Sequence, residues 1–143
     1  MRLTRKYSFS ASHRLHAPEL GDAENRALYG KCNNPFGHGH NYEIAVTVGG
    51  AVEERSGRVV DPSLLDELVR RRVLEPLAHR NLNTEVEAFR AAVPTSENLG
   101  REVMRRLKCS WPEMFPEDGP HLECVAIAET SRNLFLVTAH EIE

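Results

Sequence analysis

The sequence lacks the features of several protein classes. It contains only three cysteines, and their odd number and irregular spacing argue against a disulfide framework: Cys32, Cys109 and Cys124. No apolar run approaches the length that crosses a bilayer, and residues 1–6 contain no apolar core of a signal peptide. We therefore expect a protein of a reducing cytoplasm, with no membrane partner.

A strong excess of one charge is also missing. The formal net charge of the 143 residues is −3, which gives no electrostatic reason to expect nucleic acid as a partner. Hydrophobic residues make up 41% of the chain and charged residues 27%, as in an ordinary globular protein. Because there is no internal repeat and no low-complexity tract, we interpret residues 1–143 as a single domain.

Two kinds of periodicity predict the secondary structure. Alternation of apolar and polar side chains indicates strands, and apolar side chains at helical spacing indicate helices. A short strand is also expected at residues 58–60. Four main strands are expected, at about residues 6–13, 38–48, 121–130 and 134–142, with residues 131–133 as the tight connection between the last two.

Two helices are expected between the second and third strands. Asp61 and Pro62 are typical of a helix start, and Pro76 is expected to end or kink this helix. The second helix is expected to begin with Thr95 or Ser96 as its N-cap.

The proline-rich residues 110–120 are expected to form a loop, with Trp111, Met114 and Phe115 as a local packing plug. The order strand, strand, helix, helix, strand, strand predicts an α+β fold: a four-stranded antiparallel sheet with both helices on one face. Such a sheet has two open edges, which favour association with other copies, so we expect an oligomer.

Three histidines are expected to converge at one end of this sheet. Alternation makes His13 the last inward residue of the first strand, and His38 and His40 the first inward residues of the second. If these strands pair as an antiparallel hairpin, the three imidazoles lie side by side, where burial without a partner is costly. Three neutral imidazoles leave one position of a tetrahedral Zn²⁺ open, as in catalytic sites. Three other histidines do not share this pattern of inward strand positions and are interpreted as surface or loop residues: His16, His121 and His140.

Glu129 is the unusual residue of the third predicted strand. It shares a face with Val125 and Ile127, so its carboxylate is expected at or near the interior unless a bulge turns it to solvent. A buried carboxylate is well suited to accept two N–H donors from a planar heterocycle.

These motifs resemble the 6-pyruvoyl-tetrahydropterin synthase family, and the resemblance runs from about residue 3 to the C-terminus. Its most specific part is the CNNxxGHGHNY segment, from Cys32 to Tyr42. The matching segments are Tyr7 to His16, Tyr29 to Tyr42, Pro76-Leu77 with His79 and Asn81-Leu82, Thr95 to Asn98, and Glu129-Thr130.

The resemblance implies a tunnelling fold (T-fold), in which trimers join their sheets into a barrel and stack as a hexamer. It implies one Zn²⁺ per chain on His13, His38 and His40. A pterin ring would bind Glu129, with three residues nearby: Thr95, Ser96 and Glu97.

The implied reaction converts 7,8-dihydroneopterin triphosphate to 6-pyruvoyl-tetrahydropterin and releases triphosphate, as a carbon–oxygen lyase. Cys32 and His79 would be the reacting pair and would meet across a subunit interface, while Glu129 holds the ring. Four basic residues are candidates for contact with the triphosphate: Arg14, Arg26, Lys31 and Arg132.

Two alternatives stay open at this point. A branch of the same family makes 6-carboxy-tetrahydropterin for queuosine, but its cysteine lies closer to the HxH pair than Cys32 does. The second alternative is a weakly active or silent pterin-binding homologue. It arises because Ala78 occupies the position before His79 where the family has Asp.

Overall fold

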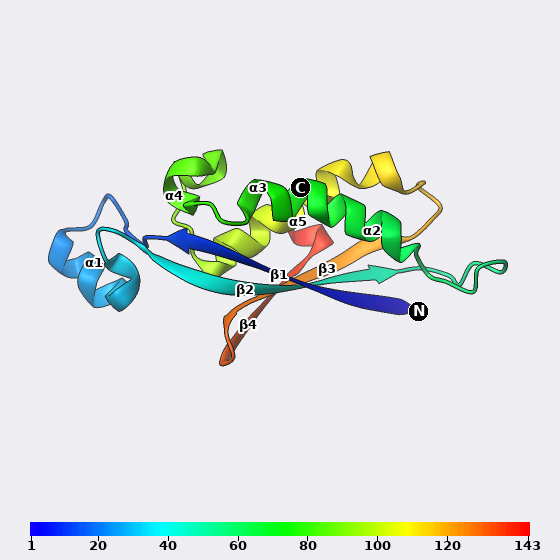
Figure 1. Ribbon diagram of the computed structural model, residues 1–143, viewed down its shortest axis with the longest axis horizontal. Helices are drawn as coiled ribbons and strands as arrows, with labels where there is room; N and C mark the ends of the chain where they lie inside the picture. The colour runs from blue at the N-terminus through cyan, green and yellow to red at the C-terminus, as the bar shows by residue number, and fades with distance from the viewer.

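The computed structural model describes residues 1–143 and contains one four-stranded antiparallel sheet in the order β1-β2-β3-β4. Helices cover one face of this sheet, and α1 lies beyond the end of β1 and β2 (Figure 1). The predicted α+β fold is therefore confirmed. The strands are β1 (Arg2–His13), β2 (His38–Gly49), β3 (His121–Thr130) and β4 (Asn133–Thr138).

The β1–β2 hairpin has the register that the alternating pattern predicts. His13 lies opposite His38, Ala11 opposite His40, and Phe9 opposite Tyr42. The side chains of Phe9, Ala11, His13 and Tyr42 are all buried, since this face of the sheet packs against the helices. The histidines are therefore the last members of a core face, at the end of the sheet.

The first helical segment runs from residue 62 to residue 77 and consists of three consecutive helical pieces. α2 (Pro62–Val69) begins where predicted, because the Asp61 side chain accepts a hydrogen bond from the amide of Ser63. A π-helical turn, η2 (Arg70–Leu74), leads into α3 (Glu75–Leu77). Pro76 has no N–H for the Arg72 carbonyl, which accepts instead from the guanidinium of Arg106. The helix ends one residue beyond Pro76, as expected.

The prediction of a loop over residues 110–120 is wrong in its first half. α5 (Ser96–Met114) starts at the Thr95 cap and runs through Pro112. Burial of Ser110, Trp111 and Phe115 continues the apolar stripe of this helix and outweighs the one backbone bond that Pro112 removes. The packing plug itself is confirmed, since the rings of Trp111 and Phe115 lie 4.5 Å apart between centroids.

Three other expectations need correction. Residues 58–60 form no strand, and the chain bends at Val59 and Val60. β4 ends at Thr138, because residues Ala139–Glu141 turn into a 3₁₀ helix whose Ala139 carbonyl accepts from the ammonium of Lys108. Several short helices have too few apolar positions to be recognised: α1 (Asp22–Tyr29), η1 (Gly30–Asn33), α4 (Leu82–Glu85) and η3 (Glu87–Phe89).

Both outer edges of the sheet lack a full strand partner. On the β1 edge, the amide of Ser12 donates to the Arg80 carbonyl and the amide of His79 donates to the Ser10 carbonyl. These bonds fix residues 79–81 beside β1 near the histidines. On the β4 edge, Leu134 and Leu136 are 63% and 64% exposed. None of the helices combines the length and the apolar character that crossing a membrane requires.

Candidate metal centre and active site

The three predicted histidines meet at the end of the β1–β2 hairpin. The ring centroids are 5.5 Å apart for His13 and His38, 4.6 Å for His13 and His40, and 4.3 Å for His38 and His40. His13 is fully buried, and the other two are half-buried. The sequence pattern alone therefore located this cluster correctly.

Gly37 allows the chain to enter β2 at this point. Its φ of +71° lies in the left-handed region that favours glycine. A Cβ at this position would lie 3.0 Å from the carbonyl oxygen of His13. The close approach of the two backbones brings His38 opposite His13.

Two ring nitrogens in the cluster have no hydrogen-bond partner. They are Nε2 of His13 and Nε2 of His40, and both are buried. Nε2 of His40 lies close to a carboxylate oxygen of Glu129, but the pair does not have the geometry of a hydrogen bond. Burial of such a nitrogen without a partner costs free energy, and a metal ion is a partner that three imidazoles suit. The residues present therefore fit a divalent metal ion.

Glu129 joins the histidine cluster from β3. Its Oε1 lies 2.7 Å from Nε2 of His40 and 3.7 Å from Nε2 of His13. Its Oε2 accepts a hydrogen bond of 2.7 Å from the hydroxyl of Ser96, which is buried at the start of α5. The carboxylate thus lies at the interior, as its strand position predicts.

Cys32 completes the cluster from η1. Its Sγ lies 3.4 Å from Nε2 of His38, and its carbonyl accepts a hydrogen bond from the amide of Leu15. One potential ligand atom from each of five residues lies within 4.8 Å of all the others: His13, Cys32, His38, His40 and Glu129.

The surroundings favour the neutral form of two of the histidines and the neutral thiol of Cys32. Burial lowers the pKa of His13 and of His40, which favours the neutral imidazoles that bind metal. Burial, and then the charge of Glu129, raise the pKa of the Cys32 thiol. A cation at the cluster would oppose both effects on the thiol.

Tyr42 and Pro94 contact the far side of His13. Nδ1 of His13 lies 2.9 Å from the carbonyl oxygen of Pro94 and 3.0 Å from the hydroxyl of Tyr42. Neither contact was expected from the sequence. Alternation on β2 places Tyr42 on the same face as His40 and could have indicated the contact between Tyr42 and His13. No sequence signal marks the carbonyl of Pro94.

The remaining predicted site residues lie outside the five-residue cluster. His79 is exposed at the β1 edge, where it lines a hollow of about 390 Å³ together with Ser10 and His40. Its φ is +61°, in the left-handed region. Thr95 caps α5 by accepting from the amide of Asn98, and Glu97 is exposed on the first turn of that helix.

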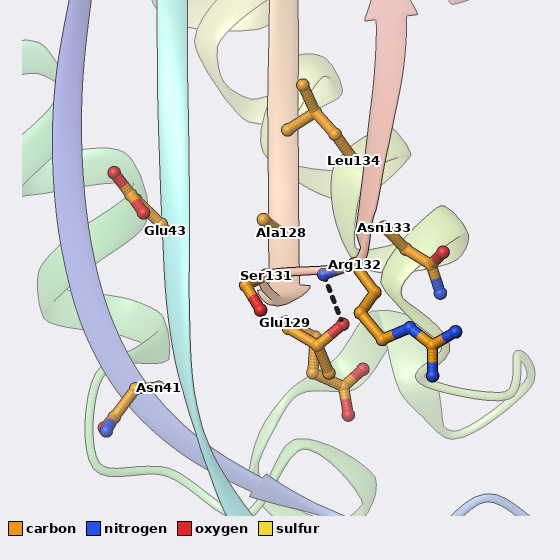
Figure 2. Close-up of a pocket in the computed structure, with 9 residues that line it drawn as sticks. Asn41, Glu43, Ala128, Glu129, Ser131, Arg132, Asn133 and Leu134 are labelled. Atoms are coloured by element: carbon orange, nitrogen blue, oxygen red, sulfur yellow. Dashed lines mark hydrogen bonds between the residues drawn. The ribbon is translucent and has the colours of Figure 1, made fainter.

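A second hollow, of about 460 Å³, lies between β2 and the turn that joins β3 to β4. Figure 2 shows the residues that line it. Asn41 and Glu43 line it from β2, while Glu129 and Arg132 line it from the end of β3 and the turn. The β2–β3 pairing ends at Glu43, so the two strands separate here. Of the other proposed triphosphate contacts, Arg14 is half-buried beside His13, and two are exposed: Arg26 and Lys31.

Comparison with known proteins agrees with this geometry. The profile of the family described as 6-pyruvoyl tetrahydropterin synthase matches residues 2–140. The chain belongs to this family. Its fold also agrees, because a solved structure of the Caenorhabditis elegans 6-pyruvoyl tetrahydropterin synthase has a TM-score of 0.85 at 41% identity, with 96% of this chain and 94% of that chain covered.

Two relatives within the family extend the comparison. The 6-pyruvoyl tetrahydrobiopterin synthase of Drosophila melanogaster is 42% identical over 134 residues, which cover 92% of this chain and 76% of the relative. The protein of the same name from Poecilia reticulata is 39% identical over 132 residues, which cover 92% and 86%. These names favour the pyruvoyl-forming interpretation over the carboxy-forming one.

Proposed function

We propose that the chain is a zinc-dependent 6-pyruvoyl-tetrahydropterin synthase. It converts 7,8-dihydroneopterin triphosphate to 6-pyruvoyl-tetrahydropterin and releases triphosphate. The observation that carries this proposal is the convergence of five potential ligand atoms within 4.8 Å, in a chain of this family.

His13, His38 and His40 would hold the zinc ion. Three histidines with one open position form a known type of catalytic zinc site. When bound, the ion supplies a positive charge that makes a neighbouring hydroxyl group and its carbon more acidic. The buried Nε2 of His13, which has no hydrogen-bond partner, supports this assignment.

Glu129 would bind the pterin ring through its carboxylate. The ring presents N–H donors in one plane, and a carboxylate accepts two such donors side by side. Ser96 holds one carboxylate oxygen of Glu129 from the buried start of α5. Thr95 and Glu97 flank Ser96 and would contact the substrate from the same helix end.

Cys32 would act as a base on the substrate side chain. As a thiolate it removes a proton from a side-chain carbon, and the electron pair moves to the ring C=N bond, which is then protonated to the tetrahydro form. A second proton removal expels triphosphate. The oxidation of the side chain balances the reduction of the ring, so no nicotinamide is required. His79 is the second candidate for this proton transfer.

His79 would come from a neighbouring subunit. In the single chain it lies at the exposed β1 edge and outside the ligand cluster. A homohexamer, built as a dimer of trimers with joined sheets, would pair the open strand edges and cover exposed apolar side chains such as Leu134 and Leu136. The proposed complete site therefore depends on assembly.

Mass spectrometry of the products from 7,8-dihydroneopterin triphosphate tests the proposed function. We expect a 6-pyruvoyl-tetrahydropterin and one triphosphate per turnover. A 6-carboxy product with acetaldehyde would contradict the proposal and support the queuosine branch. Pterin binding without any turnover would support the silent homologue.

One observation keeps the silent homologue as a second candidate: the imidazole of His79 forms no ion pair or hydrogen bond with a carboxylate in the structure. Ala78 stands where the family has Asp, and the two acidic residues nearest in the sequence are engaged elsewhere. Glu75 pairs with Arg70, and Glu85 accepts from the amide of Asn81. An imidazole without a carboxylate partner loses basicity and a preferred tautomer.

Replacing Ala78 by aspartate is expected to raise turnover about tenfold or more, which corresponds to about 1.4 kcal/mol of activation free energy. The expected gain comes from a carboxylate that orients the His79 imidazole and stabilises its protonated form. The added carboxylate is half-buried against the core, so we expect the free energy of unfolding to fall by about 1–3 kcal/mol. Steady-state kinetics well below the melting temperature measures the effect.

Ala88→Asp is the control for this prediction, because Ala88 is also half-buried against the core but precedes Phe89 instead of a histidine. It should lose stability without a gain in turnover. If Ala78→Asp is no faster than the parent enzyme, then another group already orients His79, or His79 is not the base.

A further inference from the structure

Tyr42 lies directly behind the histidine cluster. It is 1% exposed on β2, and its ring stacks on Phe9 with 5.4 Å between centroids. Its hydroxyl lies 3.0 Å from Nδ1 of His13 and has no other hydrogen-bond partner in the structure. The hydroxyl is therefore buried against one atom of a candidate metal ligand.

The carbonyl of Pro94 determines where the proton of His13 resides. A carbonyl oxygen only accepts hydrogen bonds, and it lies 2.9 Å from Nδ1 of His13. A lone pair on Nδ1 would face the lone pairs of this oxygen, so Nδ1 carries the hydrogen. In the neutral ring Nε2 then has the lone pair, and it points into the cluster without a partner.

Tyr42 adds a second oxygen on the same side of the ring. The Pro94 carbonyl oxygen and the Tyr42 hydroxyl both lie within hydrogen-bond distance of Nδ1 of His13, so both oxygens can share its hydrogen. A ring flipped about its Cβ–Cγ bond would lose both partners and would turn a carbon toward them. Each additional acceptor therefore increases the preference for the orientation in which Nε2 can bind metal.

We propose that Tyr42 is a positioning residue of the metal centre: its hydroxyl, together with the Pro94 carbonyl, fixes the tautomer and orientation of His13. This inference rests on the metal site of the proposed function. This role explains why the hydroxyl of Tyr42 is buried, although the residue opposite Tyr42 on β1 is the apolar Phe9. It also gives Tyr42 a function that phenylalanine could not supply.

The Tyr42→Phe variant of the full chain tests this proposal through metal binding. The ring and its stacking on Phe9 are kept, and only the hydroxyl is lost. We expect a Zn²⁺ affinity about 10- to 100-fold lower than in the parent protein, measured by competition with a chromophoric chelator on metal-stripped protein. The visible spectrum of the Co²⁺-loaded variant should also change, because His13 is less well oriented.

Tyr7→Phe is the matched control. Tyr7 is on β1, and its hydroxyl donates to Asp66 of α2, so this variant loses one tyrosine hydrogen bond away from the cluster. Its Zn²⁺ affinity and Co²⁺ spectrum should equal those of the parent. Equal affinities for Tyr42→Phe, Tyr7→Phe and the parent would overturn the role of Tyr42.

Two further measurements separate the possible failures. If His38→Ala also retains the parent affinity, the metal site itself is wrong; if only Tyr42→Phe retains it, the positioning proposal alone is wrong. Nitrogen-15 NMR of the metal-free parent, with His13 assigned from a His13→Asn variant, tests the tautomer without any change at Tyr42. A proton on Nε2 of His13 would overturn the proposal.

Discussion

Replacing His38 by alanine is expected to leave the purified protein without zinc and without measurable turnover. The parent protein, purified without added metal, should contain about one Zn²⁺ per chain. The change removes one of the three proposed histidine ligands, and a site with only two histidines is expected to lose the ion during purification. Elemental analysis of the protein measures the metal content directly.

The proposed oligomer should survive the His38→Ala change. His38 is the first residue of β2 and only half-buried, so its side chain contributes little to the core. His121→Ala is the matched control, because His121 is exposed on β3 and pairs with Glu123. It should keep its zinc. A His38→Ala protein that retains about one zinc ion per chain would show that the histidine cluster is not the metal site.

The histidine cluster could be predicted from the sequence because strand periodicity is strict. Because side chains on a strand alternate between its two faces, the position of a residue in the strand determines the face on which it lies. The pairing of β1 with β2 was then sufficient to bring His13, His38 and His40 together. The same reasoning placed Glu129 at the interior. A register shift between Ile127 and Thr130 could have turned it outward, but Glu129 faces the cluster.

The position of Cys32 could not be predicted from periodicity. The chain between His13 and His38 has no regular pattern, and its path depends on single polar contacts. The buried Asn25 bonds to the backbone of Ala17, and the buried Asn33 bonds to the carbonyl of Leu15. The resemblance to the family and the position of Cys32 shortly before His38 indicated this residue, and the structure places its sulfur 3.4 Å from Nε2 of His38.

The end of α5 shows a different limit of sequence reasoning. Three prolines between residues 110 and 120 predicted a loop, because proline removes one backbone hydrogen bond and crowds the preceding turn. In the fold, the burial of Trp111 and Phe115 and the bond from the Trp111 indole to the Pro120 carbonyl stabilise the helix through Pro112. Tertiary packing outweighed local preference.

Replacing Cys32 by alanine is expected to lower kcat by about 10²- to 10⁴-fold, the range for loss of a general base. This corresponds to about 2.7–5.5 kcal/mol of activation free energy. Zinc content and pterin affinity should change far less, because the three histidines and Glu129 remain. The rate of triphosphate release measures kcat, and a pterin fluorescence titration measures the affinity for the pterin. Cys109→Ala, which changes an exposed cysteine of α5, should keep the activity of the parent.

The Cys32→Ser variant distinguishes acid–base chemistry from packing. Serine keeps a small polar group beside His38, but its hydroxyl is far less acidic than a thiol and does not supply a comparable base. If Cys32 removes the substrate proton, both variants are similarly slow. If Cys32 only fills space, serine restores most of the turnover, and His79 becomes the base. Full activity of both variants would exclude any role of the sulfur, since its contact with His38 would then be structural alone.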